Sequence, residues 1–153
     1  MTTRPGLELT PIERNGASQG LRETPPSVVN DIAQATAELY ARVGFEPPWI
    51  GYLARSDGEL VGTCGFKSPP IDGRVELAYF TFPAFEGRGI ATAMARELVR
   101  IARQRDATVA IAAQTLPERN ASHRVLEKLG FTHVATLEHP EDGLVWEWRA
   151  PSA

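Results

Sequence analysis

The segment from residue 82 to residue 105 has the residue types and spacing of an anion-binding site. It reads FPAFEGRGIATAMARELVRIARQR, in which a predicted strand ends in a turn with two glycines and continues into an amphipathic helix. The first turn of a helix has backbone N–H groups without intrahelical acceptors, and glycine lets the main chain approach a ligand closely. We therefore expect the amides around Gly87 and Gly89 to bind a phosphate or diphosphate, with a charge-assisted hydrogen bond from Arg88.

Positive charge is concentrated in the same segment. Residues 86–105 contain five arginines and two acidic residues, a net charge of +3, whereas the whole chain carries −3. This segment is therefore the part of the chain best suited to face an anionic ligand. The arginines at 96, 100, 103 and 105 are individually typical of the solvated face of a helix, and that alternative stays open.

Glu76 is the candidate general base. In the strand RVELAYFTF, alternation places its side chain on one face with Ala78, Phe80 and Phe82, and leaves Val75, Leu77 and Tyr79 on the other. A carboxylate among aromatic and aliphatic neighbours is suited to accept a proton, directly or through water. A structural hydrogen bond at the edge of the strand is an equally weighted alternative.

Asn120 and Ser122 begin a second predicted helix, which Gly130 can end. Asparagine is a favoured N-cap residue, so helix capping is the structural interpretation of this pair. His123 is one position along the helix from Ser122 and therefore points elsewhere, and we predict that it is a surface histidine.

Length and composition predict one globular domain, residues 1–153, with 42% hydrophobic and 23% charged residues. The net charge of −3 and a pI near 5.6 argue against a nucleic-acid partner. No apolar run is long enough to span a bilayer and no secretory signal is evident, so no membrane partner is expected. The single cysteine, Cys64, is predicted to be a buried, unreactive thiol, and we expect a cytoplasmic location and no metal site.

The elements that must position these residues follow from hydrophobic periodicity and turn signals. We predict a strand at 7–12, a helix that Pro25 and Ser27 can start and Gly44 can end, a hairpin at 49–55 and 59–66, a strand at 74–82, a helix at 89–105, a strand at 108–114, a helix at 120–129, and strands at 132–137 and 144–148. Three adjacent strands followed by a strand–helix–strand unit predict a mixed sheet with helices packed on it, an α+β fold in three layers.

Three blocks together resemble the GNAT superfamily of N-acetyltransferases, over roughly residues 59–148. They are VELAYFTFP, EGRGIAT and TLPERNASHRVLEKLGF, in that order and spacing, and they are most similar to the branch of the ribosomal-protein-alanine N-acetyltransferases. The resemblance implies a three-layer α/β/α fold whose mixed central sheet is splayed between the fourth and fifth strands. It also implies that acetyl-coenzyme A lies in that cleft, with its pyrophosphate on the EGRGIA turn.

Carried over position by position, the resemblance implies a set of cofactor-binding residues: Phe80, Thr81, Phe82, Glu86, Gly87, Arg88, Gly89, Ile90, Ala91, Thr92, Asn120 and Ser122. Asn120 would hydrogen-bond the pantetheine arm. Ser122 would lie near the sulfur as a proton donor, so Glu76 and Ser122 are the two expected catalytic residues. Two positions depart from the family's pattern. Glu86 stands where Gln or Arg is usual, so we expect its side chain either to point outward or to pair with an arginine, while the backbone binds the diphosphate. Leu126 stands where a tyrosine usually serves as general acid.

The expected function is transfer of an acetyl group from acetyl-coenzyme A to a primary amine, directly and within a ternary complex. The acceptor is a small-molecule amine or a protein N-terminus, and the acidic composition of the segments expected to surround it favours a cationic acceptor. One alternative is a module of the same fold that binds acyl-coenzyme A without transferring the acyl group. Another is a structural protein in which EGRGIA is only a turn. Both a monomer and a homodimer are compatible with the sequence.

Overall fold

The structure is a computed structural model, and it describes residues 6–18 and 27–152. The elements in chain order are β1 (Leu7–Pro11), α1 (Ser27–Val43), β2 (Gly51–Ser56), β3 (Glu59–Phe66), β4 (Arg74–Thr81), a one-turn 3₁₀ helix (Pro83–Phe85), α2 (Ile90–Arg105), β5 (Ala110–Thr115), α3 (Ala121–Lys128), β6 (Thr132–His139) and β7 (Gly143–Arg149). The predicted order is confirmed. The 3₁₀ helix was not predicted, and Pro25 lies outside the described residues.

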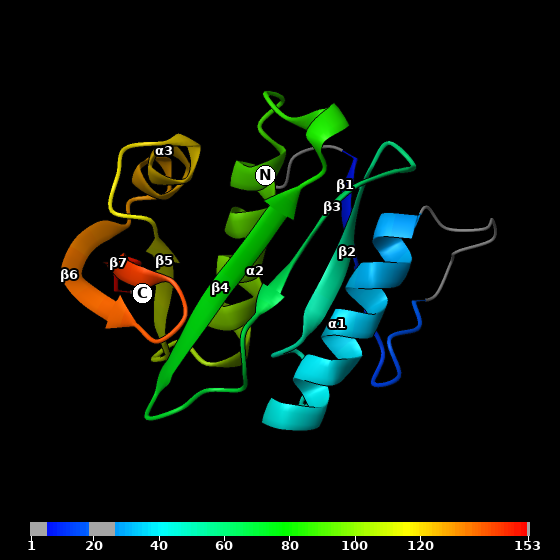
Figure 1. Ribbon diagram of the computed structural model, residues 1–153, viewed down its shortest axis with the longest axis horizontal. Helices are drawn as coiled ribbons and strands as arrows, with labels where there is room; N and C mark the ends of the chain where they lie inside the picture. The colour runs from blue at the N-terminus through cyan, green and yellow to red at the C-terminus, as the bar shows by residue number, and fades with distance from the viewer. Residues whose placement is uncertain (1–5, 19–26, 153) are drawn as a thin grey trace.

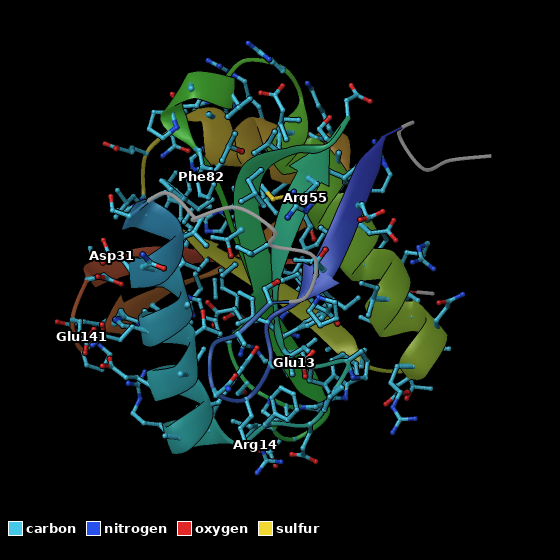
Figure 2. The ribbon with its side chains drawn as sticks, turned by 90° about the vertical axis from the view of Figure 1, so that its right-hand side faces the viewer. Glu13, Arg14, Asp31, Arg55, Phe82 and Glu141 are labelled. Carbon is cyan, nitrogen blue, oxygen red and sulfur yellow. The ribbon has the colours of Figure 1, made fainter. Side chains whose placement is uncertain are left out.

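A single seven-stranded sheet has the order β1-β2-β3-β4-β5-β7-β6. Only β4 and β5 pair in parallel, and among the described residues their register covers just Arg74, Val75 and Glu76. Helix α1 crosses one face of the sheet, and α2 crosses the other, with α3 packed beside α2 (Figure 1). Figure 2, turned by 90°, shows the strands between α1 and α2. The predicted α+β fold in three layers, splayed between the fourth and fifth strands, is therefore confirmed.

Local sequence explains where the elements turn. Helix α1 ends just before Gly44, whose φ of 100° lies in the left-handed region and whose N–H donates to the carbonyl of Tyr40 at 2.8 Å. The β2–β3 hairpin turns through Asp57 and Gly58, both with positive φ, as a two-residue loop requires. These two turns set α1 and the hairpin beside the strand that carries Glu76.

The main core lies between the sheet and α2. Met94 and Leu98 of α2 are fully buried and belong to one cluster with Val75 and Leu77 of β4. Cys64 is buried in the same cluster, as predicted, and burial raises the pKa of its thiol. Within the described ranges, no helix is both long enough and apolar enough to cross a membrane.

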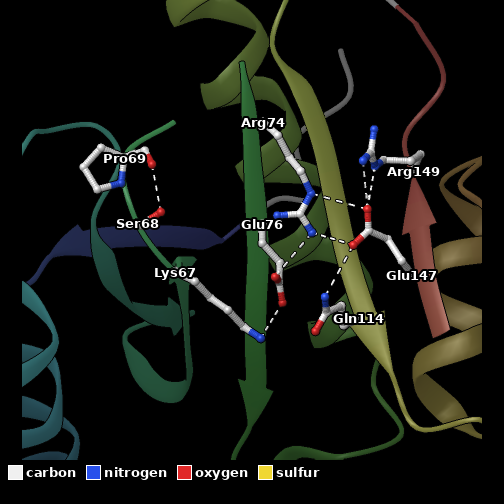
Figure 3. A network of polar contacts seen from close by, with 8 residues as sticks. All are labelled: Lys67, Ser68, Pro69, Arg74, Glu76, Gln114, Glu147 and Arg149. Carbon is white, nitrogen blue, oxygen red and sulfur yellow. Dashed lines mark hydrogen bonds and ion pairs between the residues drawn. The ribbon is translucent and has the colours of Figure 1, made fainter. Parts of the chain in front are cut away.

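A network of charged residues holds β4, β5 and β7 together beyond their backbone hydrogen bonds (Figure 3). Glu147 of β7 is only 5% exposed. Its carboxylate accepts from Arg74 Nη2 at 2.6 Å, from Arg149 Nε at 2.9 Å and from Gln114 Nε2 at 3.4 Å. Desolvation acts to raise the pKa of Glu147, but the hydrogen bonds from Arg74 and Arg149 outweigh it, so the pKa lies below its ordinary value.

The Glu147→Gln variant tests this network. Because the pKa of Glu147 is lower in the folded than in the unfolded protein, its stabilisation is present above the ordinary value of 4.5 and is lost as the pH falls through the folded pKa. We expect the substitution to lower the free energy of unfolding at neutral pH by about 1–3 kcal/mol and to flatten its pH dependence below 4.5. Urea unfolding at a series of pH values measures both effects.

Glu127→Gln is the matched control, because the Glu127 side chain is 45% exposed and its ion pair with Arg119 spans 3.5 Å. Exposed pairs contribute about 0–1 kcal/mol, so this variant should behave like the parent. A Glu147→Gln variant with the parent's stability and pH slope would show that the network contributes nothing.

Candidate functional site

A cavity of about 520 Å³ opens where β4 departs from β5. Its walls come from β4, the turn before α2, the first turn of α2, and α3. The lining residues are Tyr79, Phe80, Thr81, Phe85, Glu86, Gly87, Gly89, Ile90, Ala91, Thr92, Ala121, Ser122, Arg124, Val125 and Lys128. Nine of the twelve residues predicted to bind the cofactor lie in this lining.

The open edge of β4 forms one wall. Beyond Glu76, β4 stays hydrogen-bonded to β3 up to Thr81 but has no register with β5 in the described chain. A strand edge without a neighbour offers backbone N–H and C=O groups to an extended ligand. Thr81 Oγ1 is also buried there without a hydrogen-bond partner among the described residues. Buried polar atoms are rarely left unpaired, so the wall suits a ligand with amide groups.

The turn from Glu86 to α2 forms the opposite end. Gly87 has φ 79° and Gly89, the N-cap of α2, has φ 77°, and no side chain of the described residues caps the helix. A Cβ at Gly87 would meet no atom within 4 Å, so the left-handed conformation and not crowding requires glycine there. The uncapped amides in the first turn of α2 have the geometry that binds an anion, and anion binding by this turn stays a prediction.

Three predicted cofactor-binding residues do not line the cavity. Arg88 is not a lining residue, but its guanidinium lies 5.4 Å from the ring centroid of Phe85, which does line the cavity, in a cation–π contact. Phe82 is 8% exposed and packs in a second core cluster on the α1 side. Asn120 caps α3, with its side-chain oxygen accepting from Ser122 N at 2.9 Å. Capping is thus confirmed, and contacts of these three residues with a cofactor remain predictions.

The cations that do line the cavity are Arg124 and Lys128 of α3, which the sequence analysis did not single out. The sequence could have indicated them, because Ala121, Arg124 and Lys128 recur at three- and four-residue spacing and so share one face of the helix. Glu86 is exposed and also lines the cavity. The lining therefore carries two cations and one acid.

Tyr79 was placed on a strand face by its alternation but was given no role. Its side chain is partly buried and lines the cavity, as does Ser122 of α3. Burial raises the pKa of Tyr79 to about 12, and the Ser122 hydroxyl group opposes part of that rise. Two hydroxyl groups from different elements thus lie in the wall of the same cavity. No local sequence pattern predicts that these two residues share a site.

Glu76 lies outside this cavity. Its carboxylate forms an ion pair with Lys67 and another with Arg74 Nη2 at 3.5 Å (Figure 3). The predicted surroundings of aromatic and aliphatic carbon are therefore wrong at the carboxylate itself, because charged side chains from the end of β3 and from the start of β4 reach it. The side chain is 12% exposed.

A second cavity of about 200 Å³ adjoins the first. Tyr79 and Phe80 line both cavities, and Lys67, the partner of Glu76, lines the second. Its remaining lining is mostly apolar or small: Thr36, Leu39, Gly51, Thr63, Cys64, Gly65, Phe66 and Ala78. The two cavities therefore share the wall that Tyr79 and Phe80 form.

His123 is a correction. It was predicted at the surface, but it is 1% exposed, with Nε2 3.3 Å from the carbonyl oxygen of Leu116 and its ring stacked on Trp146. His123 does point away from Ser122, but β7 covers that side of α3 and therefore buries the ring. Leu126, at the position where a tyrosine is usual in the resemblance, is fully buried in the core. The described part of the chain has no cluster of three or more His, Cys, Asp or Glu side chains that could hold a metal ion.

Comparison with known proteins agrees with this geometry. The sequence model of the acetyltransferase (GNAT) domain family matches residues 16–132. N-acetylaspartate synthetase of Rattus norvegicus is 30% identical over 92 residues, which are 60% of this chain and 29% of the synthetase. The FsC-acetyl coenzyme A-N(2)-transacetylase of Aspergillus fumigatus is 29% identical over 102 residues, 61% of this chain and 42% of that enzyme. The chain thus spans less than half the length of these curated relatives.

Solved structures share the fold. The ribosomal L7/L12 alpha-N-protein acetyltransferase RimL superposes with a TM-score of 0.72 at 17% identity, covering 98% of this chain and 96% of that one. The same protein in complex with coenzyme A gives a TM-score of 0.70 at 17% identity, covering 96% and 94%. Since the family's sequence model covers most of this chain, the chain belongs to the GNAT acetyltransferases.

Proposed function

We propose that this protein transfers the acetyl group of acetyl-coenzyme A to a primary amine, directly, in a ternary complex and without a covalent acyl-enzyme. The observation that carries the proposal is the pair of adjoining cavities with Tyr79 and Phe80 in their common wall. The larger cavity suits the donor and the smaller one the acceptor. Direct transfer requires the two to meet at one point.

The donor side rests on the lining described above. The amides of the turn from Gly87 into α2 would hold the diphosphate, with Arg124 and Lys128 adding positive charge. The open edge of β4 would hydrogen-bond the pantetheine amides, which brings the thioester toward Ser122. The three other predicted cofactor-binding residues, Phe82, Arg88 and Asn120, lie outside the lining.

In the proposed reaction a neutral amine attacks the thioester carbonyl, a C–N bond forms and the C–S bond breaks. Glu76 accepts the proton that the nitrogen loses, through water, since Lys67 connects it to the smaller cavity. The sulfur keeps the electron pair of the broken bond, and Ser122 donates to it. No metal takes part in this scheme.

The acceptor is a primary amine on a small molecule or at a protein N-terminus. The relatives' names include an aspartate derivative and a ribosomal protein, so they define no single class for this chain. We place the activity in one cytoplasmic domain, because the single cysteine of the chain is buried and cannot form an intrachain disulfide. The ion-paired state of Glu76 favours one alternative, a module that binds acyl-coenzyme A without transfer.

The test is an acceptor screen. Acetyl-coenzyme A is incubated with peptides bearing free N-termini, amino acids including aspartate, and polyamines, and the acetylated products are identified by mass spectrometry. We expect at least one amine to be acetylated. Tight binding of coenzyme A without any product would support the binding module, and absence of binding would contradict the donor site.

Gly87→Ala tests the diphosphate end of the donor cavity. Left-handed backbone costs a non-glycine residue roughly 1–2 kcal/mol, so the turn relaxes and its amides shift. We expect the dissociation constant for coenzyme A, measured by calorimetry, to rise about tenfold. Gly58→Ala is the matched control, because Gly58 also has positive φ, 86°, and open space around its Cβ position, but lies in the β2–β3 turn. Equal binding by both variants would remove the turn from the site.

Glu76→Gln tests the base. We expect normal binding of acetyl-coenzyme A and a turnover number lower by about 10²- to 10⁴-fold, because a positioned base contributes that much. Urea unfolding of the same variant separates the alternatives. A loss of stability with unchanged turnover would make Glu76 a structural ion-pair partner.

A further inference from the structure

The α1 side of β4 is left uncovered beside the smaller cavity. The strand lies in the middle of the sheet, and its residues on the α2 side, Val75 and Leu77, are buried. On the α1 side, by contrast, Ala78 is exposed and Phe80 is 50% exposed. Both line the smaller cavity. Removing apolar surface from water is favourable, so this stretch of β4 is suited to an apolar group of a ligand.

The size of the smaller cavity limits that group. Its volume is about 200 Å³, and its lining is mostly apolar or small, with Leu39 of α1 and Phe66 of β3 beside the residues of β4. An apolar cavity of about 150 Å³ binds benzene. The smaller cavity therefore has room for a benzene-sized body with a short polar arm, and not for several residues of a peptide.

Lys67 supplies the only charge in this lining, as far as the described chain extends. None of the described acidic residues lines the smaller cavity. Coulomb attraction therefore favours a carboxylate on the ligand, whereas a ligand with a second ammonium group, such as a polyamine, would be repelled. The acidic composition of the surrounding segments indicates the opposite charge, but composition does not show which side chains reach the cavity.

Lys67 has capacity for a second carboxylate although it already pairs with Glu76 (Figure 3). The charged residues of Figure 3 are three cations, Lys67, Arg74 and Arg149, and two carboxylates, Glu76 and Glu147, so one positive charge is left over. The Lys67 side chain is 50% exposed, and an ammonium group has three hydrogens to donate. A carboxylate of a ligand would thus neutralise the surplus charge without breaking the pair with Glu76.

We propose that the acceptor is a small amino acid with an apolar side chain and a free carboxylate, and that Lys67 selects it by donating a hydrogen bond to that carboxylate. The apolar side chain covers Ala78 and Phe80, and the amine points to the wall that Tyr79 and Phe80 share with the donor cavity. The inference rests on the proposed transferase function and narrows its acceptor. A protein N-terminus fits less well, because its first residue continues into an amide and has no carboxylate there.

The carboxylate takes no part in making or breaking bonds. The amine nitrogen forms a C–N bond with the acetyl carbon, the C–S bond breaks, and the sulfur keeps its electron pair. The nitrogen loses one proton, which Glu76 accepts through water, as in the proposed reaction. Lys67 therefore acts on the binding and placement of the acceptor, and its effect depends on whether the acceptor carries a carboxylate.

Lys67→Met tests the assignment with two acceptors, phenylalanine and phenylalaninamide, which differ only in the carboxylate. Methionine keeps an apolar chain and removes the ammonium group. We expect the ratio of kcat/KM for phenylalanine to kcat/KM for phenylalaninamide to fall about 3- to 10-fold in the variant, the effect of one half-exposed charge-assisted hydrogen bond. An effect of the substitution on Glu76 acts on both acceptors, and the different basicity of the two amines acts on both proteins, so both cancel in this comparison.

Arg42→Met is the matched control. Arg42 is exposed in the last turn of α1, lines neither cavity, and its loss changes the net charge of the protein by the same amount. It should keep the parent's ratio. An unchanged ratio in Lys67→Met would overturn the inference, and so would an equal fall in Arg42→Met, because the effect would then come from net charge alone.

Glycine and spermidine test the rest of the proposed acceptor. Glycine has the amine and the carboxylate of phenylalanine but no apolar side chain, so the parent's kcat/KM should be about 10- to 100-fold higher for phenylalanine. Spermidine brings additional positive charge and no carboxylate, and it should be a poorer acceptor than phenylalanine. Acetylation of glycine or spermidine at the rate of phenylalanine or faster would contradict the inference.

Calorimetry measures the same contact without turnover. The protein saturated with coenzyme A is titrated with phenylalanine, and we expect the dissociation constant to be about 3- to 10-fold higher in Lys67→Met than in the parent. If the parent binds coenzyme A but not phenylalanine, or if both proteins bind phenylalanine equally, the inference fails while the proposed function stands. A parent that acetylates no amine would contradict the proposed function, and the inference with it.

Discussion

Parallel pairing between β4 and β5 stops at Glu76, and the donor cavity exists because it stops there. The Arg74–Glu147 pair holds the paired end closed, because it connects β4 to β7 across β5. Beyond this point the two strands are free to diverge around a ligand. Because the pairing of β4 with β5 ends after three residues, the sheet has an unpaired strand edge in its interior. Such an internal edge is protected from the pairing with other chains that exposed edges invite.

The same strand also divides the donor from the acceptor. Alternation along β4 sends Val75 and Leu77 into the core below α2, while Glu76 and Ala78 face the side of α1. At Tyr79 and Phe80 the strand becomes the wall between two cavities. One β-strand thereby supplies core packing, a carboxylate and both sides of a reaction centre, which explains why its sequence mixes aromatic, aliphatic and charged residues.

What could be predicted from the sequence was local or periodic. The strand and helix order follows from hydrophobic period, and the EGRGIA turn follows from two glycines before an amphipathic helix. What could not be predicted depends on contacts between distant segments. The cations beside Glu76 come partly from the end of β3, and the ring that covers His123 comes from β7. Tyr79 and Ser122 line the same cavity although they are more than forty positions apart, so the sequence around neither residue indicates that they share a site.

Burial of Cys64 also determines how this protein can be studied. Its thiol is enclosed in the main core, and its raised pKa leaves almost no thiolate at neutral pH. An aromatic disulfide dye reacts with thiolates, and this chain has no other cysteine to offer it. The folded protein should therefore contribute almost no background colour, and every mole of dye released would report coenzyme A set free by turnover.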